Sequence, residues 1–158
     1  MVTIRYHTTD SREIERIRPL WEKLRAFHAA CLPDLRDRLG RMTFEERSDL
    51  LLRKAAGGLL WLEIAQADGG DIGCCVSTIS EAKAGEIDMI YVDEAHRGEG
   101  VGMALMEHAL RWLEEHRADP ISLSVGVGNE GVIAFYRRFG FFPRHIVLER
   151  RVDGGRQS

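Results

Sequence analysis

Arg97-Gly98-Glu99-Gly100-Val101-Gly102 decides the fold, because this glycine-rich turn leads directly into a helical pattern that runs to His116. Gly98 and Gly100 lack a Cβ, so they permit positive φ and close approach of a ligand to backbone N–H groups. The unpaired N–H groups of the first helical turn and the positive end of the helix dipole converge on this turn. The stretch therefore predicts an anion site, to which Arg97 can add a charge-assisted hydrogen bond.

Spacing excludes the two commonest nucleotide-binding loops. The dinucleotide fingerprint GxGxxG requires a glycine where Met103 stands. The phosphate loop GxxxxGK[ST] does not occur in the sequence. Taken alone, the turn is also compatible with a plain glycine-rich connection that binds nothing.

The periodicity on both sides of the turn predicts one mixed α/β domain over residues 1–152, with a frayed tail at 153–158. The element order is β-α-α-β-β-β-α-β-α-β, in which the second and third strands form an antiparallel hairpin. The strand, helix and strand around the turn form a parallel crossover. Strands are predicted at Thr3–Thr8, Leu59–Gln66, Ile72–Ser80, Glu86–Val92, Ile121–Val127 and Phe141–Val152.

Capping signals predict where the helices begin and end. Asp10 and Thr43 each stand three residues before a glutamate, which is the spacing of a capping box. The first helix should reach about Cys31, with Pro19 either kinking it or starting its second half. The second should end near Gly57. The remaining helices are predicted at Val101–His116 and Gly131–Phe139.

The composition is that of a soluble cytoplasmic protein. The 158 residues include 44% hydrophobic and 30% charged residues, and the net charge of -3 provides no general attraction to nucleic acid or membrane. The N-terminus has no apolar signal region, and no window approaches the apolar length of a membrane span. Cys31, Cys74 and Cys75 lack the spacing of a zinc site, so we expect reduced core cysteines and no metal. Cys74 and Cys75 should face opposite sides of their strand.

Two motifs resemble the GNAT N-acetyltransferase superfamily. The segment 90–102 resembles its [RQ]xxGxG[GA] signature, with Arg97, Gly100 and Gly102 in the defining positions. The segment 129–141 resembles a second family block, N-x-x-A-x-x-F-Y-x-x-x-G-F. The resemblance covers about residues 84 to 142, and the first 80 residues match only in element order. The segment Pro19-Leu20-Trp21 and the second capping box also resemble a group of bacterial members.

The resemblance implies that acetyl-coenzyme A is the cosubstrate. In this family the strands before and after the crossover helix diverge, and the pantetheine arm lies between them. Here those strands are Glu86–Val92 and Ile121–Val127, and a backbone N–H of the first could stabilise the oxyanion. The resemblance assigns coenzyme A contacts to Ile90, Tyr91, Val92, Arg97, Gly98, Glu99, Gly100, Val101, Gly102, Met103, Asn129 and Tyr136.

The resemblance also implies which residues act as the general acid and the general base. Tyr136 suits the general acid for the departing thiolate, because a phenol and an alkyl thiol have similar pKa values. Glu86 aligns with the base of the histone-acetylating branch, and Asp88, two residues along the strand, is the reserve. The structural alternatives are a packing ring at Tyr136, a solvated carboxylate at Glu86 and a helix N-cap at Asn129.

The sequence thus predicts an N-acetyltransferase acting on a small molecule or peptide amine. Protein lysine acetylation is the rival within the fold, and a non-catalytic acyl-coenzyme A sensor is the rival from another class. By analogy with relatives, the segment His145–Arg150 could pair across a homodimer. Candidates for the acceptor pocket, by position only, are His28, Asp34, Arg36, Arg38 and Phe44.

Overall fold

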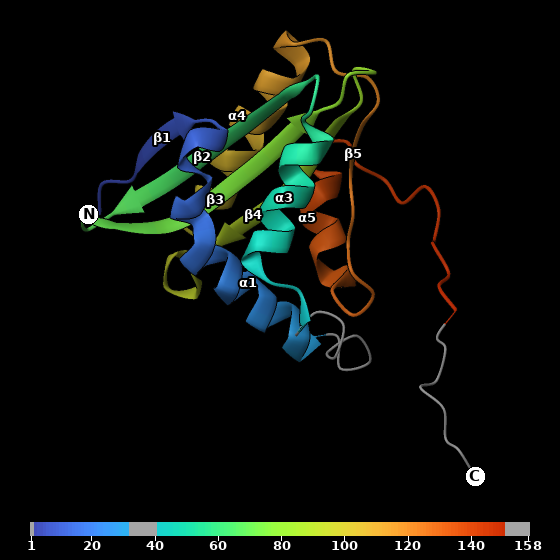
Figure 1. Ribbon diagram of the computed structural model, residues 1–158. Helices are drawn as coiled ribbons and strands as arrows, with labels where there is room; N and C mark the ends of the chain where they lie inside the picture. The colour runs from blue at the N-terminus through green and yellow to red at the C-terminus, as the bar shows by residue number, and fades with distance from the viewer. Residues whose placement is uncertain (1, 32–40, 151–158) are drawn as a thin grey trace.

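The computed structural model describes residues 2–31 and 41–150. Its centre is a five-stranded sheet in the order β1-β2-β3-β4-β5 (Figure 1). The first four strands pair antiparallel, whereas β4 and β5 pair parallel, as the crossover around the glycine-rich turn predicted. The strands are β1 (Arg5–Thr9), β2 (Leu59–Ala67), β3 (Gly70–Ile79), β4 (Gly85–Val92) and β5 (Ile121–Leu123).

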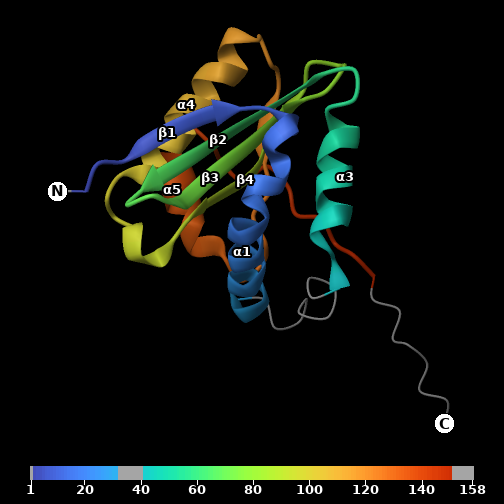
Figure 2. The ribbon, with the colours of Figure 1, turned by 60° about the vertical axis from the view of Figure 1, so that its left-hand side comes forward.

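Helices cover both faces of the sheet. Figure 2 shows α1 and α3 on one face, with α4 and α5 on the other. A buried apolar cluster with Ile17, Leu51 and Leu62 lies under α1 and α3, and a second with Leu105 and Leu113 lies under α4. The helices are α1 (Arg18–Cys31), α3 (Phe44–Lys54), α4 (Val101–Glu115) and α5 (Ile133–Arg137), with 3₁₀ turns η1 (Ser11–Ile17), η3 (Glu94–His96) and η4 (Glu130–Val132).

Of the two predicted capping boxes, one forms. Thr43 Oγ1 accepts from the Glu46 N–H at 3.1 Å, and the Thr43 N–H donates to Glu46 Oε2 at 2.8 Å, which begins α3. The prediction of a capping box at Asp10 was wrong. The Asp10 side chain accepts instead from the backbone N–H of Arg12 and begins a 3₁₀ turn. The α-helix proper then begins at Arg18, immediately before Pro19, so the proline starts the second half of this segment.

The predicted hairpin is confirmed with a tighter turn. Asp68 and Gly69 both have positive φ, 52° and 78°, which is the backbone of a two-residue type I′ connection. The two adjacent cysteines separate as expected, because Cys74 packs in the cluster under α1 and Cys75 in the cluster under α4. The three cysteines are free.

The C-terminal part departs from the prediction. The expected strand Ile121–Val127 pairs only over Ile121–Leu123, and no strand forms over the described part of Phe141–Val152. Pro143 lacks the N–H that a paired strand needs, and Ile146, Val147 and Leu148 are 80%, 78% and 91% exposed without a neighbouring strand. The proposed tail at 153–158 lies outside the described residues. Among the described helices, none has the length and apolar character to cross a membrane.

A side-chain contact between Glu63 and His108 attaches α4 to β2. Glu63 on β2 is 3% exposed, and its carboxylate lies 2.8 Å from His108 Nδ1 on α4. Thr8 on β1 donates to the same carboxylate at 3.2 Å, and Tyr6 packs edge-on against the imidazole with ring centroids 5.2 Å apart. These contacts attach the middle of α4 to β1 and β2, while the helix lies mainly over β3 and β4.

Candidate active site

The turn before α4 has the geometry of an anion cradle. Gly98 and Gly100 adopt left-handed backbones with φ of 82° and 81°, and Gly100 is the N-cap of α4. A Cβ built on either glycine would meet no heavy atom within 4 Å, so the space above the turn is open. The backbone N–H groups of the first turn of this 15-residue helix therefore face a free volume.

The side chain of Arg97 lies beside the cradle rather than in it. Its Nε donates to the carbonyl of Val92 at 3.1 Å. Its guanidinium carbon lies 5.4 Å from the ring centroid of Phe27 on α1 and 5.9 Å from that of Tyr91. A phosphate contact from Arg97 stays a prediction.

The sheet opens next to the cradle. The parallel ladder joins β4 to β5 only from Gly85↔Ile121 to Ile87↔Leu123. The register between β3 and β4 then shifts, since Val76 faces Met89 whereas Ser77 faces Ile87. Asp88 is thus the extra residue of a β-bulge, a feature that is common beside active sites. Beyond it, β4 pairs with β3 on one edge, and no strand of the described residues lies on the other.

The three residues predicted to carry the pantetheine lie on this open stretch. Ile90, Tyr91 and Val92 pair with Cys75, Cys74 and Gly73 of β3. Their other edge, which β5 leaves uncovered, leads directly to the cradle. The open edge and the cradle thus form a continuous backbone surface along which an extended phosphate-bearing chain could lie.

The two carboxylates predicted as bases do face the same way, and Lys54 of α3 lies between them. Lys54 Nζ is 2.6 Å from Glu86 Oε2 and also contacts Asp88 Oδ1. Thr78 on β3 donates to Asp88 Oδ2 at 2.7 Å. The Asp88 side chain is 1% exposed, whereas that of Glu86 is 34% exposed. Of the two, Glu86 is thus the one that a substrate can reach.

Burial and charge act against each other in this cluster. Burial raises the pKa of Asp88, and the hydrogen bonds from Lys54 and Thr78 offset only part of that rise. Partial burial would lower the pKa of Lys54, but the bonds to Asp88 and Glu86 outweigh it and the pKa is raised. Lys54 therefore stays an ammonium and serves as the counter-ion of a buried carboxylate.

Lys54→Met is expected to lower the unfolding free energy by about 2–3 kcal/mol near neutral pH, because it leaves Asp88 buried without a cation. A carboxyl whose folded pKa is raised costs no stability below its unfolded pKa, and the cost grows with pH until it is complete above the folded pKa. The loss should therefore shrink as the pH falls from about 7 to about 4 and Asp88 takes up a proton. Urea denaturation across this range measures it, with the exposed neighbour Arg53→Met as control. A loss independent of pH would contradict the role of Asp88.

Tyr136 lies on α5, against the core under α4. Its ring packs edge-on with Phe135 and Phe141, with centroids 5.4 Å and 6.4 Å away. Burial, with a smaller electrostatic effect of Cys75, raises the pKa of Tyr136 to about 12. The hydroxyl thus carries its proton throughout the neutral range and can donate a hydrogen bond to sulfur, but its raised pKa lies farther above that of an alkyl thiol than the ordinary phenol value does.

The remaining predicted contacts are placed as follows. Asn129 stands at the N-cap position of η4, but its side chain makes no capping hydrogen bond there. Glu99 accepts from His96 at 3.0 Å on the outer rim of the cradle. Val101 is buried, whereas Gly102 and Met103 are half-buried in the first turn of α4.

The acceptor-side candidates fare unevenly. The prediction that Phe44 lines the acceptor pocket was wrong, because its side chain is 1% exposed and packs edge-on against Trp21 in the core. His28 is half-buried on α1, and this burial lowers its pKa. The other three candidates, Asp34, Arg36 and Arg38, lie outside the described residues.

Two residues of α3 that lie near β4 were not predicted as site residues from the sequence. Lys54 contacts both carboxylates, and Arg47 Nη2 donates to the carbonyl of Asp88 at 2.8 Å. They are seven residues apart, which places them on one face of a helix. That spacing was the available signal, but only the pairing of α3 with β4 shows what this face contacts.

Comparison with known proteins identifies the family. The family model described as "Acetyltransferase (GNAT) family" matches residues 20–141. An uncharacterised N-acetyltransferase of Methanocaldococcus jannaschii is 33% identical over 100 residues, which are 61% of this chain and 44% of that protein. A mycothiol acetyltransferase of Propionibacterium freudenreichii is 31% identical over 135 residues, 79% of this chain and 39% of that protein. The chain thus spans less than half the length of these curated relatives.

Among solved structures, an aminoglycoside N-acetyltransferase, AAC(6')-Iy, in complex with CoA has a TM-score of 0.63 to this chain at 16% identity. The similarity covers 96% of each chain. At this level of identity the match shows a common fold.

Proposed function

The chain belongs to the acetyltransferase (GNAT) family, and from this premise we propose that it transfers the acetyl group of acetyl-CoA to a primary amine. The observation that carries the proposal is the open edge of β4 beyond Asp88, which runs into the cradle at Gly98 and Gly100. Such an edge offers hydrogen bonds to the amide groups of pantetheine, and the cradle offers N–H groups to its pyrophosphate. The structural relative in complex with CoA supports this choice of ligand.

In the proposed reaction the amine attacks the thioester directly, within one complex of the enzyme and both substrates. The new N–C bond forms as the C–S bond breaks, and a backbone N–H of the open stretch Ile90–Val92 stabilises the charge on the carbonyl oxygen. Glu86, alone or through a water, accepts the proton of the amine, and Asp88 remains the reserve base. Tyr136 donates a hydrogen bond, and then a proton, to the departing sulfur.

The position of Lys54 bears on whether Glu86 or Asp88 acts as the base. Glu86 already has the ammonium of Lys54 as a partner, with Nζ 2.6 Å from its Oε2. A half-exposed carboxylate can nevertheless exchange protons with solvent, whereas Asp88 is shielded. We therefore assign Glu86 to the attacking amine and Asp88, with Lys54 and Thr78, to holding the bulge.

A free-thiol release assay with acetyl-CoA and a broad amine panel tests the proposal. Release that depends on the amine, with acetylated product confirmed by mass spectrometry, is the expected outcome. Tight binding of acetyl-CoA in calorimetry with no turnover across the panel would favour the alternative, a non-catalytic acyl-CoA sensor. Selective acetylation of lysine-containing peptides would favour a protein acetyltransferase over a small-molecule enzyme.

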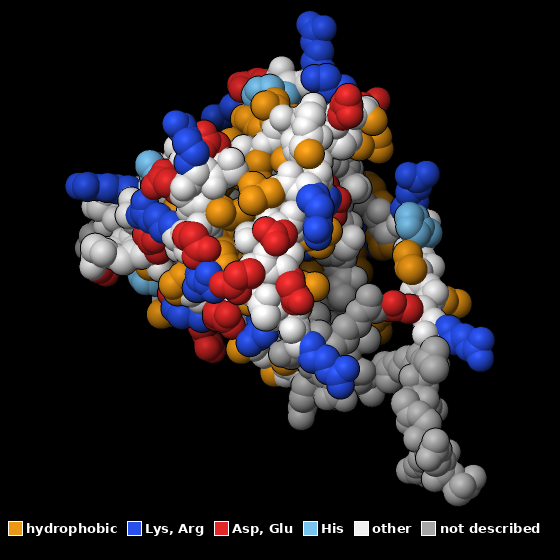
Figure 3. Space-filling model, in the orientation of Figure 1, with side chains coloured by type: hydrophobic (Ala, Val, Ile, Leu, Met, Phe, Trp, Pro, Cys, Tyr) orange, Lys and Arg blue, Asp and Glu red, His pale blue; other side chains and the backbone are white. Residues whose placement is uncertain are grey.

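We also propose that the protein works in the cytoplasm as a homodimer, with neither nucleic acid nor membrane as a partner. Three free cysteines support a reducing compartment. The dimer is supported by the apolar segment Ile146–Leu148, which is exposed in the single chain. The charges over α1 and α3 are interspersed in sign rather than gathered into a basic patch (Figure 3), which favours a small acceptor over a polyanion.

A further inference from the structure

Helix α3 presents two cations to the bulged strand, and only one of them has an acidic partner. Lys54 contacts Glu86 and Asp88. Arg47, two turns earlier on the same face, donates from Nη2 to the carbonyl of Asp88 at 2.8 Å. Throughout the part of the chain that the structure describes, no carboxylate forms an ion pair with Arg47.

The backbone contact accounts for a small part of what Arg47 can do. A guanidinium has five N–H donors in a planar fork, and this one uses a single nitrogen to reach one carbonyl. Arg47 is half-buried, so its charge is partly removed from water, and residues 2–31 and 41–150 provide no compensating carboxylate. A neutral donor would satisfy the bulge carbonyl equally well. A permanent cation held at this point therefore suits an anion that arrives from outside the chain.

The location indicates which anion that would be. The carbonyl that holds Arg47 belongs to the bulge residue, the point where β5 leaves the edge of β4 and the proposed thioester site begins. Glu86, two residues earlier on the strand, is the proposed base for the amine. An acceptor lying between them would place its amine toward Glu86 and a neighbouring group toward Arg47.

On the basis of the proposed function, we infer that Arg47 determines acceptor specificity by binding a carboxylate close to the reacting amine, as in an α-amino acid. The four side-chain charges at the bulge, those of Glu86, Asp88, Lys54 and Arg47, sum to zero, so a zwitterion adds no net charge to the site. A planar carboxylate can accept two parallel hydrogen bonds from the guanidinium fork, which a neutral amide cannot.

The test compares matched acceptors in the thiol-release assay. The pairs are L-alanine with L-alaninamide, L-lysine with 1,5-diaminopentane, and phosphoethanolamine with ethanolamine. The wild-type protein should acetylate the carboxylate members of the first two pairs with the higher kcat/KM. Arg47→Gln should lower kcat/KM for those members by about 10- to 100-fold, mainly through KM, and leave their partners without a carboxylate nearly unchanged. Arg47→Lys should recover only part of the loss, because it keeps the charge but not the fork.

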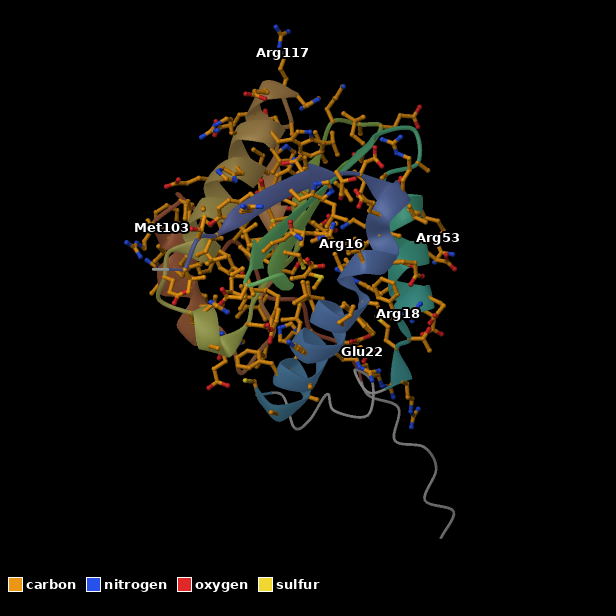
Figure 4. The ribbon with its side chains drawn as sticks, turned by 90° about the vertical axis from the view of Figure 1, so that its left-hand side faces the viewer. Arg16, Arg18, Glu22, Arg53, Met103 and Arg117 are labelled. Carbon is orange, nitrogen blue, oxygen red and sulfur yellow. The ribbon has the colours of Figure 1, made fainter. Side chains whose placement is uncertain are left out.

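Arg53→Gln is the matched control, because Arg53 projects away from the sheet on the exposed side of α3 (Figure 4). A purely structural role for Arg47 would lower activity toward both members of each pair equally, and that result would overturn the inference. A preference for phosphoethanolamine alone, or for the amines without a carboxylate, would also overturn it. If none of the six is acetylated, the inference fails, while the proposed function is judged separately by turnover on the broad amine panel.

Discussion

Gly100→Val is expected to abolish detectable binding of acetyl-CoA, weakening it by about 100-fold or more. Gly100 is the N-cap of α4 with φ of 81°, a backbone that a β-branched residue adopts only at a cost of about 1–2 kcal/mol. The new side chain would also project into the open volume above the turn, where the pyrophosphate is proposed to lie. Isothermal titration calorimetry with coenzyme A measures the change.

Gly69→Val separates these two effects. Gly69 has nearly the same backbone, with φ of 78°, and an added Cβ would again meet no atom within 4 Å, but it lies in the β2–β3 hairpin turn. Both variants should lose similar stability, and only Gly100→Val should lose coenzyme A binding. Wild-type affinity in a folded Gly100→Val protein would refute the cradle assignment.

Tyr136→Phe is expected to lower kcat by about 10- to 1000-fold with little change in affinity for acetyl-CoA. The substitution keeps the ring that packs against Phe135 and Phe141 and removes only the hydroxyl. With a pKa of about 12, the wild-type phenol stays protonated until well above neutrality, so its own ionisation should cause no loss of kcat below about pH 10.

Tyr6→Phe is the matched control. Tyr6 lies on β1, three strands away from β4, and its ring packs against His108 of α4. It should leave kcat unchanged. Steady-state kinetics over a range of pH, together with calorimetry, distinguish a catalytic hydroxyl from a structural one. A kcat for Tyr136→Phe equal to that of the wild type would remove Tyr136 from the mechanism.

The sequence was most informative where a local signal determines the structure. The glycine spacing predicted the turn and the start of α4, because positive φ and a free Cβ position are properties of single residues. Thr43 and Glu46 predicted the start of α3 for the same reason. The separation of Glu86 and Asp88 predicted that they face the same way, because side chains alternate along a strand.

The rest depends on which elements lie beside one another. Lys54 meets the carboxylates of β4, and Arg47 a backbone carbonyl of β4, only after α3 packs across the sheet; Lys54 and Glu86 are 32 residues apart in the sequence. The pair between Glu63 and His108 spans 45 residues. A strand also needs a partner. Ile146–Leu148 has the composition of a strand, but no described strand lies beside it. The pattern of apolar residues cannot predict whether a neighbouring strand will be there.

The short parallel ladder has a consequence for local unfolding. Three residue pairs connect β5 to β4, so the part of the chain that holds Asn129 and Tyr136 is joined to the sheet mainly through packing against α4. Its backbone amides should therefore open and exchange with solvent more readily than those of β2 and β3. A molecule bound along the free edge of β4 would connect the two sides, so that ligand binding would slow hydrogen exchange in β5 and α5 more than elsewhere.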